Sequence, residues 1–289
     1  MKKIFALGLA LMMTLTLLAG CGGQPQPSSS VPDPASGETS GSDASPAATQ
    51  YGTITEGKLI VGLDDQFPPM GFRDENNELT GFDIELAKEV ASRLGLEAVL
   101  TPIDWTTKEL EVNGGKVDLL WNGLTITPER QESMLVSPAY IANAQVVVVG
   151  TDSGIETLAD LAGKVVGLQE TSSADEAYAE CAAAGTESQL IKAGDNITLF
   201  SDLKIGRIDA VVIDKVFADY YIAENGEGKL RTLEEQLADE EYGVAFRKGN
   251  DTLADAVLTA LNEMVKDGKA AEISQKWFGE DRVIFQYEG

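Results

Sequence analysis

Residues 121–130, WNGLTITPER, place an amide, a glycine, two hydroxyls and a guanidinium directly after an apolar run. The Thr-Pro pair inside this segment is typical of a helix start, with threonine as the N-cap and proline in the first turn. Free N–H groups at a helix start attract anions, and an arginine fork matches a carboxylate in two parallel hydrogen bonds. The segment therefore predicts a site for a small carboxylate at Gly123, Thr125 and Arg130. The alternative is an ordinary capped helix with a solvated arginine.

A second polar ending occurs in VVIDKVFADYY, where Asp214 comes after four apolar residues. Ligands of open α/β sheets bind beyond the carboxyl ends of the strands. Asp214 is therefore either a carboxylate that pairs with an ammonium group or a simple cap of a helix over 215–224. A carboxylate site on one segment and an ammonium site on the other match the two ends of an α-amino acid.

The segment LQETSSADEAY, residues 168–178, places three hydroxyls before a helical pattern. We expect Thr171, Ser172 and Ser173 to cap this helix, because hydroxyls accept hydrogen bonds from the free N–H groups of a first turn. The same hydroxyls and N–H groups are also suited to bind the carboxylate that Arg130 holds. The segment thus predicts both a helix start and a further part of the site.

Two aromatic residues and one acidic residue follow the ends of predicted strands. Phe67 lies in DDQFPPMGF and Trp105 lies in PIDWTTKE. They are either core residues or walls that enclose the aliphatic part of a ligand. Asp64 ends the run LIVGLD and is either a turn residue or a partner for a polar or cationic ligand side chain.

Strand and helix patterns alternate along the chain and must position these residues. Short apolar runs predict strands over 59–63, 96–100, 117–121, 145–149, 164–168 and 209–213. Helical patterns predict helices over 84–94, 174–184, 197–205, 215–224 and 252–266. This alternation favours an α/β fold with mainly parallel sheets.

A weak internal repeat links the two polar endings. Gly115-Lys116-Val117-Asp118-Leu119 resembles Gly206-Arg207-Ile208-Asp209-Ala210, and each copy follows a helical segment and opens an apolar strand. Five residues beyond each aspartate, the chain reaches Gly123 in one copy and Asp214 in the other. The repeat predicts that two halves of the chain present polar groups at equivalent edges.

Composition excludes several classes of function. The chain has 289 residues, enough for two modest domains, and a formal net charge of −25. Such an acidic chain is unsuited to nucleic acid, whose phosphates require a basic surface. It contains no histidine and only two cysteines, Cys21 and Cys181, which are too few for a disulfide framework or a cysteine-based zinc site. We expect no metal and no cofactor.

The first 50 residues have the composition of a leader and a tether. A basic start, an apolar run and small residues at the end of 1–20 predict a signal peptide, the alternative being an uncleaved anchor. Leu18-Ala19-Gly20-Cys21 resembles a bacterial lipobox, which implies cleavage before Cys21 and a lipid on its sulfur. The rest of 21–50 is rich in Pro, Ser and Gly and predicts a disordered linker. So acidic a chain needs a covalent anchor to stay at an anionic membrane surface.

Seven sequence blocks stand in a characteristic order: LTGFDIELAKEV, NGLTITPER, SPAY, DLAGKVVGLQ, GRIDAVVID, YGVAFRKG and KWFG. In this order they resemble the bacterial solute-binding proteins of family 3, the polar amino acid receptors of ABC importers, over about residues 55–280. The resemblance implies an α/β fold of the two-lobe periplasmic-binding-protein type (type II) with a two-stranded hinge. Lobe 1 is then 51–141 plus 242–289, and lobe 2 is 142–241.

The same resemblance implies roles for individual residues. Arg130 takes the ligand carboxylate together with Ser173, while Thr125 and the carbonyl of Gly123 hold the ammonium, with Asp214 as its counter-ion. The full ligand-binding set that it implies is Asp64, Phe67, Trp105, Asn122, Gly123, Thr125, Arg130, Gln169, Ser172, Ser173 and Asp214.

The sequence departs from the family pattern at two points. Thr171 stands where a glycine usually precedes the paired hydroxyls, with Glu170 before it, and Asn122 replaces the common Ser or Ala. Both changes add polarity near the site, so the side-chain preference cannot be taken from any one relative. With Asp64 and Asp65 nearby, they favour a cationic or amide side chain (arginine, lysine, glutamine or histidine) or a larger polar ligand such as cystine.

The sequence therefore predicts an extracytoplasmic lipoprotein that captures a polar L-amino acid and delivers it to the membrane permease of an ABC importer. We expect a monomer without enzymatic activity. Two alternatives share the fold. One is a secreted dehydratase-like enzyme, for which Glu170 is the candidate general acid; the other is a sensor input domain, which usually continues into a membrane helix and a signalling module.

Overall fold

The computed structural model describes residues 50–181, 188–226 and 228–288. The predicted signal peptide, Cys21 and nearly all of the linker lie outside the described residues, as does the end of the predicted helix 174–184. The chain from Pro46 onward forms one compact unit. Within the described part, no helix has the length and hydrophobicity that are needed to cross a bilayer.

The strands of this unit belong to one large sheet and one small one. The large sheet contains β1 (Lys58–Leu63), β5 (Glu97–Pro102), β6 (Leu119–Thr125), β7 (Leu135–Val136), β8 (Ile141–Gly150), β9 (Val165–Gln169), β10 (Gln189–Ala193), β11 (Ala210–Asp214), β12 (Leu230–Thr232) and β13 (Ala238–Phe246). Its order is β10-β9-β11-β8-β13-β6-β1-β5, with β12 beside β8 and β7 beside β13. The small sheet contains β2 (Gln66–Phe67), β3 (Gly71–Arg73) and β4 (Leu79–Thr80).

The helices alternate with the strands as the apolar pattern predicts. They are α1 (Phe82–Arg93), α2 (Lys108–Asn113), α3 (Pro128–Ser133), α4 (Ser173–Glu180), α5 (Asn196–Lys204), α6 (Lys215–Tyr221), α7 (Asp251–Asp267) and α8 (Lys269–Phe278). Each strand and each helix that the sequence predicts has a counterpart in the structure, and their ends differ by a few residues. The α/β prediction is therefore confirmed.

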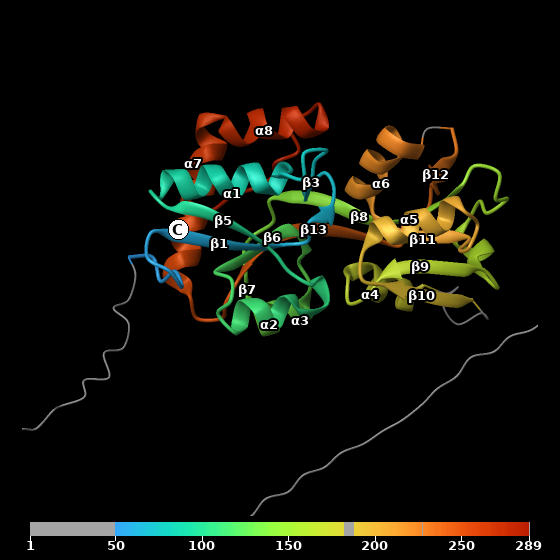
Figure 1. Cartoon of the computed structure of the whole chain (residues 1–289), viewed down its shortest axis with the longest axis horizontal. Coiled ribbons are helices and arrows are strands. Elements are labelled where there is room, and N and C mark those ends of the chain that lie inside the picture. The colour runs from blue at the N-terminus through green and yellow to red at the C-terminus, as the bar shows by residue number, and fades with distance from the viewer. Residues whose placement is uncertain (1–49, 182–187, 227, 289) are drawn as a thin grey trace, which may run out of the picture. The chain divides into compact units, whose positions relative to one another are not determined.

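The sheet has two parallel halves. In the first half-sheet, made of β5, β1 and β6, both pairings are parallel, and α1, α7 and α8 lie on one face with α2 and α3 on the other (Figure 1). In the second half-sheet, made of β10, β9 and β11, both pairings are also parallel. Because helices cover both faces, β6 and β11 are buried along their whole length. This burial explains why they read as continuous apolar runs in the sequence.

Two antiparallel strands, β8 and β13, join the half-sheets. The start of β8 pairs with the start of β13, from Tyr242 opposite Ile141 to Ala238 opposite Gln145. Beyond this shared stretch β8 continues beside β11 of the second half-sheet, whereas β13 continues beside β6 of the first. Each strand therefore passes from one half to the other, as Figure 1 shows. The fold is the two-lobe type II fold with a two-stranded hinge that the sequence predicts.

The internal repeat has a structural basis. Gly115 and Gly206 both have φ near +71°, a left-handed conformation that favours glycine. Asp118 then accepts hydrogen bonds from the N–H groups of Ile54 and Ile60, at 2.6 and 2.7 Å, and Asp209 accepts one from the N–H of Val165, at 2.8 Å. In both copies a glycine turns the chain out of a helix and an aspartate fixes the new strand against its parallel neighbour. The strands β6 and β11 consequently end at corresponding edges of the two halves.

Candidate ligand-binding site

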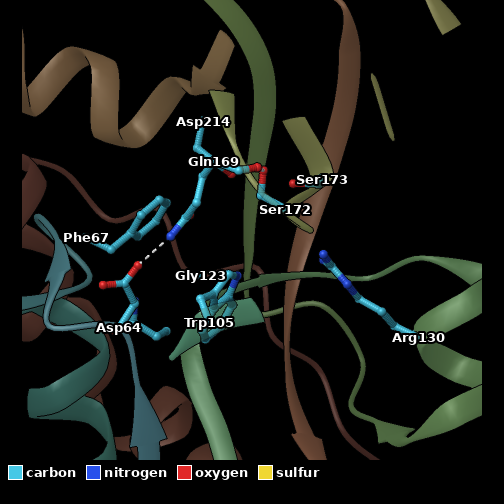
Figure 2. Close-up of a pocket in the computed structure, with 10 residues that line it drawn as sticks. Asp64, Phe67, Trp105, Gly123, Arg130, Gln169, Ser172, Ser173 and Asp214 are labelled. Carbon is cyan, nitrogen blue, oxygen red and sulfur yellow. Dashed lines mark hydrogen bonds between the residues drawn. The ribbon is translucent and has the colours of Figure 1, made fainter. Parts of the chain in front are cut away.

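A pocket lies between the two half-sheets, where these strands end (Figure 2). Its lining is Asp64, Phe67, Trp105, Asn122, Gly123, Arg130, Gln169, Ser172, Ser173 and Asp214. The structure thus brings together every residue of the predicted set except Thr125. Thr125 lies beneath the lining, where its hydroxyl donates to Glu240 Oε2 at 3.1 Å and lies 3.0 Å from the hydroxyl of Ser173.

Arg130 forms a cationic end of the pocket. Its helix α3 begins as predicted, because the hydroxyl of Thr127 accepts a hydrogen bond from the Arg130 N–H at 3.2 Å. Arg130 is only 3% exposed, and its guanidinium donates to the carbonyl oxygen of Thr125 at 2.8 Å. Within the described part of the chain it forms no ion pair. The solvated-arginine alternative is therefore wrong, and most of the five N–H donors of a buried cation remain for a ligand.

A second buried cation, Lys108, lies near this end. Lys108 is 4% exposed, and its ammonium donates to the carbonyl oxygens of Thr171 at 2.8 Å and Trp105 at 3.4 Å. Burial, and then the positive charge of Arg130, lowers the pKa of Lys108 to about 8. The contact with Thr171 therefore spans the pocket, because Lys108 lies on the side of the first half-sheet and Thr171 on the side of the second. Sequence reasoning missed Lys108, because a lysine at a helix start reads as solvated.

Asp214 forms the anionic end. Its Oδ1 atom accepts hydrogen bonds from the Tyr242 hydroxyl at 2.6 Å and from Asn143 Nδ2 at 2.8 Å. Asp214 stands at the N-cap position of α6 but makes no side-chain capping bond; instead Asn143 Oδ1 accepts the N–H of Val216 at 3.3 Å. The capping alternative for Asp214 is therefore wrong. Burial raises the pKa of its carboxyl, against the lowering effect of its hydrogen bonds and of Arg130.

A second carboxylate, Glu240, lies beside Asp214 and was not predicted from the sequence. Its Oε2 atom accepts hydrogen bonds from Thr125 Oγ1 at 3.1 Å and from Asn143 Nδ2 and Gln145 Nε2 at 3.0 Å each. Burial, and then the negative charge of Asp214, raises the pKa of Glu240 to about 7. Its sequence context, ADEEY on the hinge strand β13, reads as a solvated acidic run and gives no signal of this position.

The backbone at Gly123 is held in place by Asp83, the aspartate of the block LTGFDIELAKEV. Its φ is +59°, and a Cβ there would lie 2.8 Å from Phe67 Cε1, so both conformation and space require glycine. Its N–H donates to Asp83 Oδ2 at 2.7 Å, and the same oxygen accepts from the Tyr140 hydroxyl at 2.8 Å. Burial raises the pKa of Asp83 to about 7. Asp83 thereby orients the backbone at the centre of the site without lining the pocket.

Asp64 and Gln169 meet across the pocket from opposite half-sheets. Asp64 Oδ2 accepts from Gln169 Nε2 at 2.9 Å, as the dashed line in Figure 2 shows, and Asp64 Oδ1 accepts from the Gln66 N–H at 2.9 Å. The Gln169 Oε1 atom in turn accepts from Asn196 Nδ2 at 3.0 Å. Burial raises the pKa of Asp64 to about 6. Asp64 is thus both a turn residue and a pocket carboxylate, and its hydrogen bonds in the described part come from neutral donors.

Of the other polar residues that the sequence singles out, Ser172 and Asn122 line the pocket, whereas Glu170 and Asp65 do not. Ser172 does not cap α4 with its side chain, because its hydroxyl donates to the carbonyl of Gln169 at 2.8 Å; the capping prediction is wrong. Asn122 lines the pocket, and neither of its buried amide atoms has a partner among the described residues. Glu170 is exposed and is absent from the pocket lining, and Asp65 pairs with Arg73 at 2.6 Å outside it.

Comparison with known proteins gives a consistent result. A sequence profile described as bacterial extracellular solute-binding proteins, family 3, matches residues 59–280. The L-cystine-binding protein TcyJ of Escherichia coli (strain K12) is 35% identical over 228 residues, which is 78% of this chain and 84% of that protein. The arginine-binding extracellular protein ArtP of Bacillus subtilis (strain 168) is 32% identical over 225 residues, 76% of this chain and 86% of that protein.

A solved structure supports the same relationship. An ABC uptake transporter substrate binding protein from Streptococcus pneumoniae, crystallised with bound histidine, superposes with a TM-score of 0.74 at 37% sequence identity. The match covers 79% of this chain and 95% of that one. The similarity therefore extends over both half-sheets and the strands that join them.

Proposed function

Because the chain belongs to the bacterial extracellular solute-binding proteins of family 3, we propose that it captures an L-amino acid outside the cytoplasm and delivers it to an ABC importer. One observation carries the choice of ligand. The pocket holds an arginine at one end, which forms no ion pair among the described residues. At the other end it holds the buried carboxylate of Asp214, whose hydrogen bonds come from the neutral side chains of Tyr242 and Asn143. An α-amino acid offers a carboxylate and an ammonium that would complete both ends.

The proposed mechanism is closure of two lobes on the ligand. Lobe 1 comprises 51–141 plus 242–289, and lobe 2 comprises 142–241. The ligand first docks on lobe 1 through Arg130, Thr125 and the carbonyl of Gly123. Bending of the β8–β13 hinge then brings lobe 2 to it, and the ligand favours closure because part of its contacts exist only in the closed state.

The residues proposed for lobe 2 already lie close to lobe 1. The hydroxyls of Ser173 and Thr125 lie 3.0 Å apart, and Gln169 donates to Asp64 at 2.9 Å. Asp214 lines the same pocket as Arg130. These distances support Ser173 as a further partner of the ligand carboxylate and Asp214 as the counter-ion of the ammonium.

The proposed ligand carries a polar side chain with hydrogen-bond donors. Asp64 offers a buried carboxylate at the wall formed with Phe67 and Trp105, and Gln169 and Asn122 add amide groups to the lining. A cationic side chain, the amide of glutamine or the distal ammonium of cystine fits these acceptors. The relatives named for cystine, arginine and histidine are consistent with this range.

The proposed location is the outer face of the cell membrane. A lipid on Cys21 would hold the protein there, and the linker up to residue 50 would let the folded unit move. The dehydratase alternative finds no support at the site, because its candidate acid, Glu170, is exposed and outside the pocket lining.

Calorimetric titration tests the proposal. Protein starting at residue 22 is unfolded and refolded to remove any bound ligand, and is then titrated with the twenty L-amino acids and cystine. We expect saturable binding of one or a few of them, lost in Arg130→Ala and strongly weakened in Asp214→Ala. A folded protein that binds none of them, or an Arg130→Ala variant that binds as tightly as the original, would contradict it.

A further inference from the structure

Two neighbouring carboxylates, the buried Asp214 and the partly buried Glu240, share one amide group at the anionic end of the pocket. Asn143 Nδ2 donates to Asp214 Oδ1 at 2.8 Å and to Glu240 Oε2 at 3.0 Å. Asp214 lines the pocket, whereas Glu240 lies on the hinge strand β13 and reaches the site through the hydroxyl of Thr125. The pair therefore connects the predicted ammonium site to the hinge.

The groups that face this pair are almost all neutral. Besides Asn143, Glu240 is bonded by Thr125 of β6 and Gln145 of β8, and Asp214 by the hydroxyl of Tyr242 of β13. The remaining charge that acts on the pair is Arg130 of α3, which lowers the pKa of Asp214 but makes no ion pair with it among the described residues.

Two carboxylates in such an environment disfavour full ionisation of both. Burial disfavours each charged form, and the like charge of the neighbour adds to this effect. The pKa of Glu240 is raised to about 7, by burial first and Asp214 second, and the pKa of Asp214 is raised as well. In the empty pocket one proton on the pair reduces the repulsion.

We propose that Asp214 and Glu240 share one proton when the pocket is empty, and that the ammonium group of the ligand replaces this proton on binding. The inference rests on the proposed function, since it requires an amino acid ligand. The charges balance: a pair of charge −1 that holds a proton becomes a pair of charge −2 beside an ammonium of charge +1, and the proton leaves to solvent. Glu240 is then a positioning residue that acts on the ligand through Asp214 and Thr125.

The exchange makes ligand affinity depend on pH. Above about pH 8.5 the pair is almost fully ionised, so affinity is nearly constant. Below its pKa the ligand must displace a proton, so affinity falls, by about eightfold between pH 7.5 and pH 6 for a single group of pKa about 7. Asp64, with a pKa of about 6, adds a second dependence for cationic side chains at lower pH.

The test is a count of the protons released on binding. Protein starting at residue 22, which keeps the compact unit from Pro46 onward, is titrated calorimetrically in buffers of different ionisation enthalpy. The ligand is the L-amino acid that the screen above identifies, with L-glutamine preferred where it binds because its side chain is uncharged. Glu240→Gln is the test variant, and Glu241→Gln, an exposed neighbour on the same strand, is the matched control.

We expect release of about one proton at pH 6 and almost none at pH 8.5 for the original protein and for Glu241→Gln. Glu240→Gln should release markedly fewer protons at pH 6, and its affinity should change less than about twofold from pH 6 to 7.5. No release by the original protein at pH 6, or equal release by Glu240→Gln, would overturn the inference while leaving the proposed function intact. Failure of every amino acid to bind would instead overturn the proposed function.

A second measurement covers the case in which Glu240→Gln does not fold. The carboxyl carbons of the glutamates in the original protein are followed by NMR across pH 5 to 9, with and without ligand, and Glu241→Gln assists the assignment. Ligand should lower the pKa of the Glu240 carboxyl by more than one unit. A pKa that stays the same when ligand is added would contradict the proton exchange.

Discussion

The two ends of the pocket carry opposite charges, and different kinds of neutral group form hydrogen bonds with them. At the cationic end, Arg130 and Lys108 each donate to a backbone carbonyl, that of Thr125 and that of Thr171. At the anionic end, Asp214 and Glu240 accept from hydroxyl and amide side chains. Neither end has an ion pair with the other within the described residues, so a ligand would not have to break one.

This difference determines which end of the pocket changes its charge with pH. An arginine stays protonated at every physiological pH, so Arg130 keeps its charge, whereas Lys108, with a pKa lowered to about 8, loses its proton only above neutrality. The anionic end holds two carboxyls with raised pKa values, one of them about 7, and it therefore titrates near neutrality. We expect the cationic end to supply most of the binding energy and the anionic end to supply its pH dependence.

Of the substitutions that test this comparison, removal of Arg130 should reduce ligand affinity the most. Arg130→Ala leaves the ligand carboxylate buried and unpaired, which should cost about 3–5 kcal/mol, or more than about 100-fold in Kd. Calorimetry with the identified ligand measures the loss. Arg207→Ala is the control, because Arg207 is an exposed arginine paired with Asp202 at 2.7 Å. An equal loss of affinity in both variants would contradict the role of Arg130 in binding the ligand carboxylate.

Neutralisation of Asp214 should have a smaller effect. Asp214→Asn keeps the shape of the side chain and an oxygen for the Tyr242 hydroxyl, and the negative charge of Glu240 remains behind Thr125. We expect a loss of about 2–3 kcal/mol in binding, roughly 30- to 150-fold in Kd. Asp219→Asn, on the same helix but exposed and paired with Lys215, is the control. A larger loss here than in Arg130→Ala would reverse the ranking of the two ends.

The ligand-free protein should lose stability as pH rises. The folded-state pKa of Glu240 lies above its ordinary value, at about 7 against 4.5, so the folded protein keeps a proton that the unfolded chain has already lost. Its contribution to the free energy of unfolding is thus present below pH 4.5 and is lost as pH rises to about 7. Asp64 and Asp83 act in the same direction.

Because Glu240 is partly solvated, we expect a decrease of about 1–2 kcal/mol from this residue between pH 5 and 7.5. Urea unfolding at the two pH values measures it, and Glu240→Gln should flatten the change relative to Glu241→Gln. Ligand affinity is expected to move in the opposite direction over the same range. Stability that rises with pH to the same extent in both variants would contradict the raised pKa of Glu240.

Much of the fold and the lining of the pocket follow from local sequence patterns. Buried parallel strands read as apolar runs, and the polar residue at the end of each run, such as Gly123 or Asp214, must lie at the sheet edge. That geometry explains why residues predicted one at a time line a single pocket. Their roles in binding remain predictions.

The groups that act behind the lining do not follow from such patterns. Thr125 and Glu240 are 115 residues apart in the sequence. Asn143 contacts both Asp214 and Glu240 because its strand β8 pairs with β11 and with β13 in fixed registers. The capping prediction for Ser172 was wrong for a different, local reason: the carbonyl of Gln169, three residues earlier, accepts a hydrogen bond from its hydroxyl. Local propensity says nothing about partners that tertiary packing supplies.

The smallest expected effect concerns Lys108, which tests whether the cationic end also helps to hold the pocket closed. Its ammonium bonds to Thr171 on the opposite side of the pocket, and Thr171 is exposed, so water can replace the ammonium at that carbonyl. Lys108→Met should therefore weaken binding by only about 1 kcal/mol, roughly fivefold, and mainly through faster dissociation. Lys116→Met, at an exposed lysine paired with Glu111, is the matched control.

Stopped-flow fluorescence can follow the two rates, since Trp105 lines the pocket. If Lys108 bridges the lobes, the dissociation rate rises and the association rate is unchanged, because the bridge exists only after closure. If Lys108 acts through its charge alone, association of the ligand carboxylate slows instead and becomes less sensitive to salt. The second outcome would assign Lys108 to the electrostatics of the cationic end and leave closure to Asp64, Gln169 and the ligand.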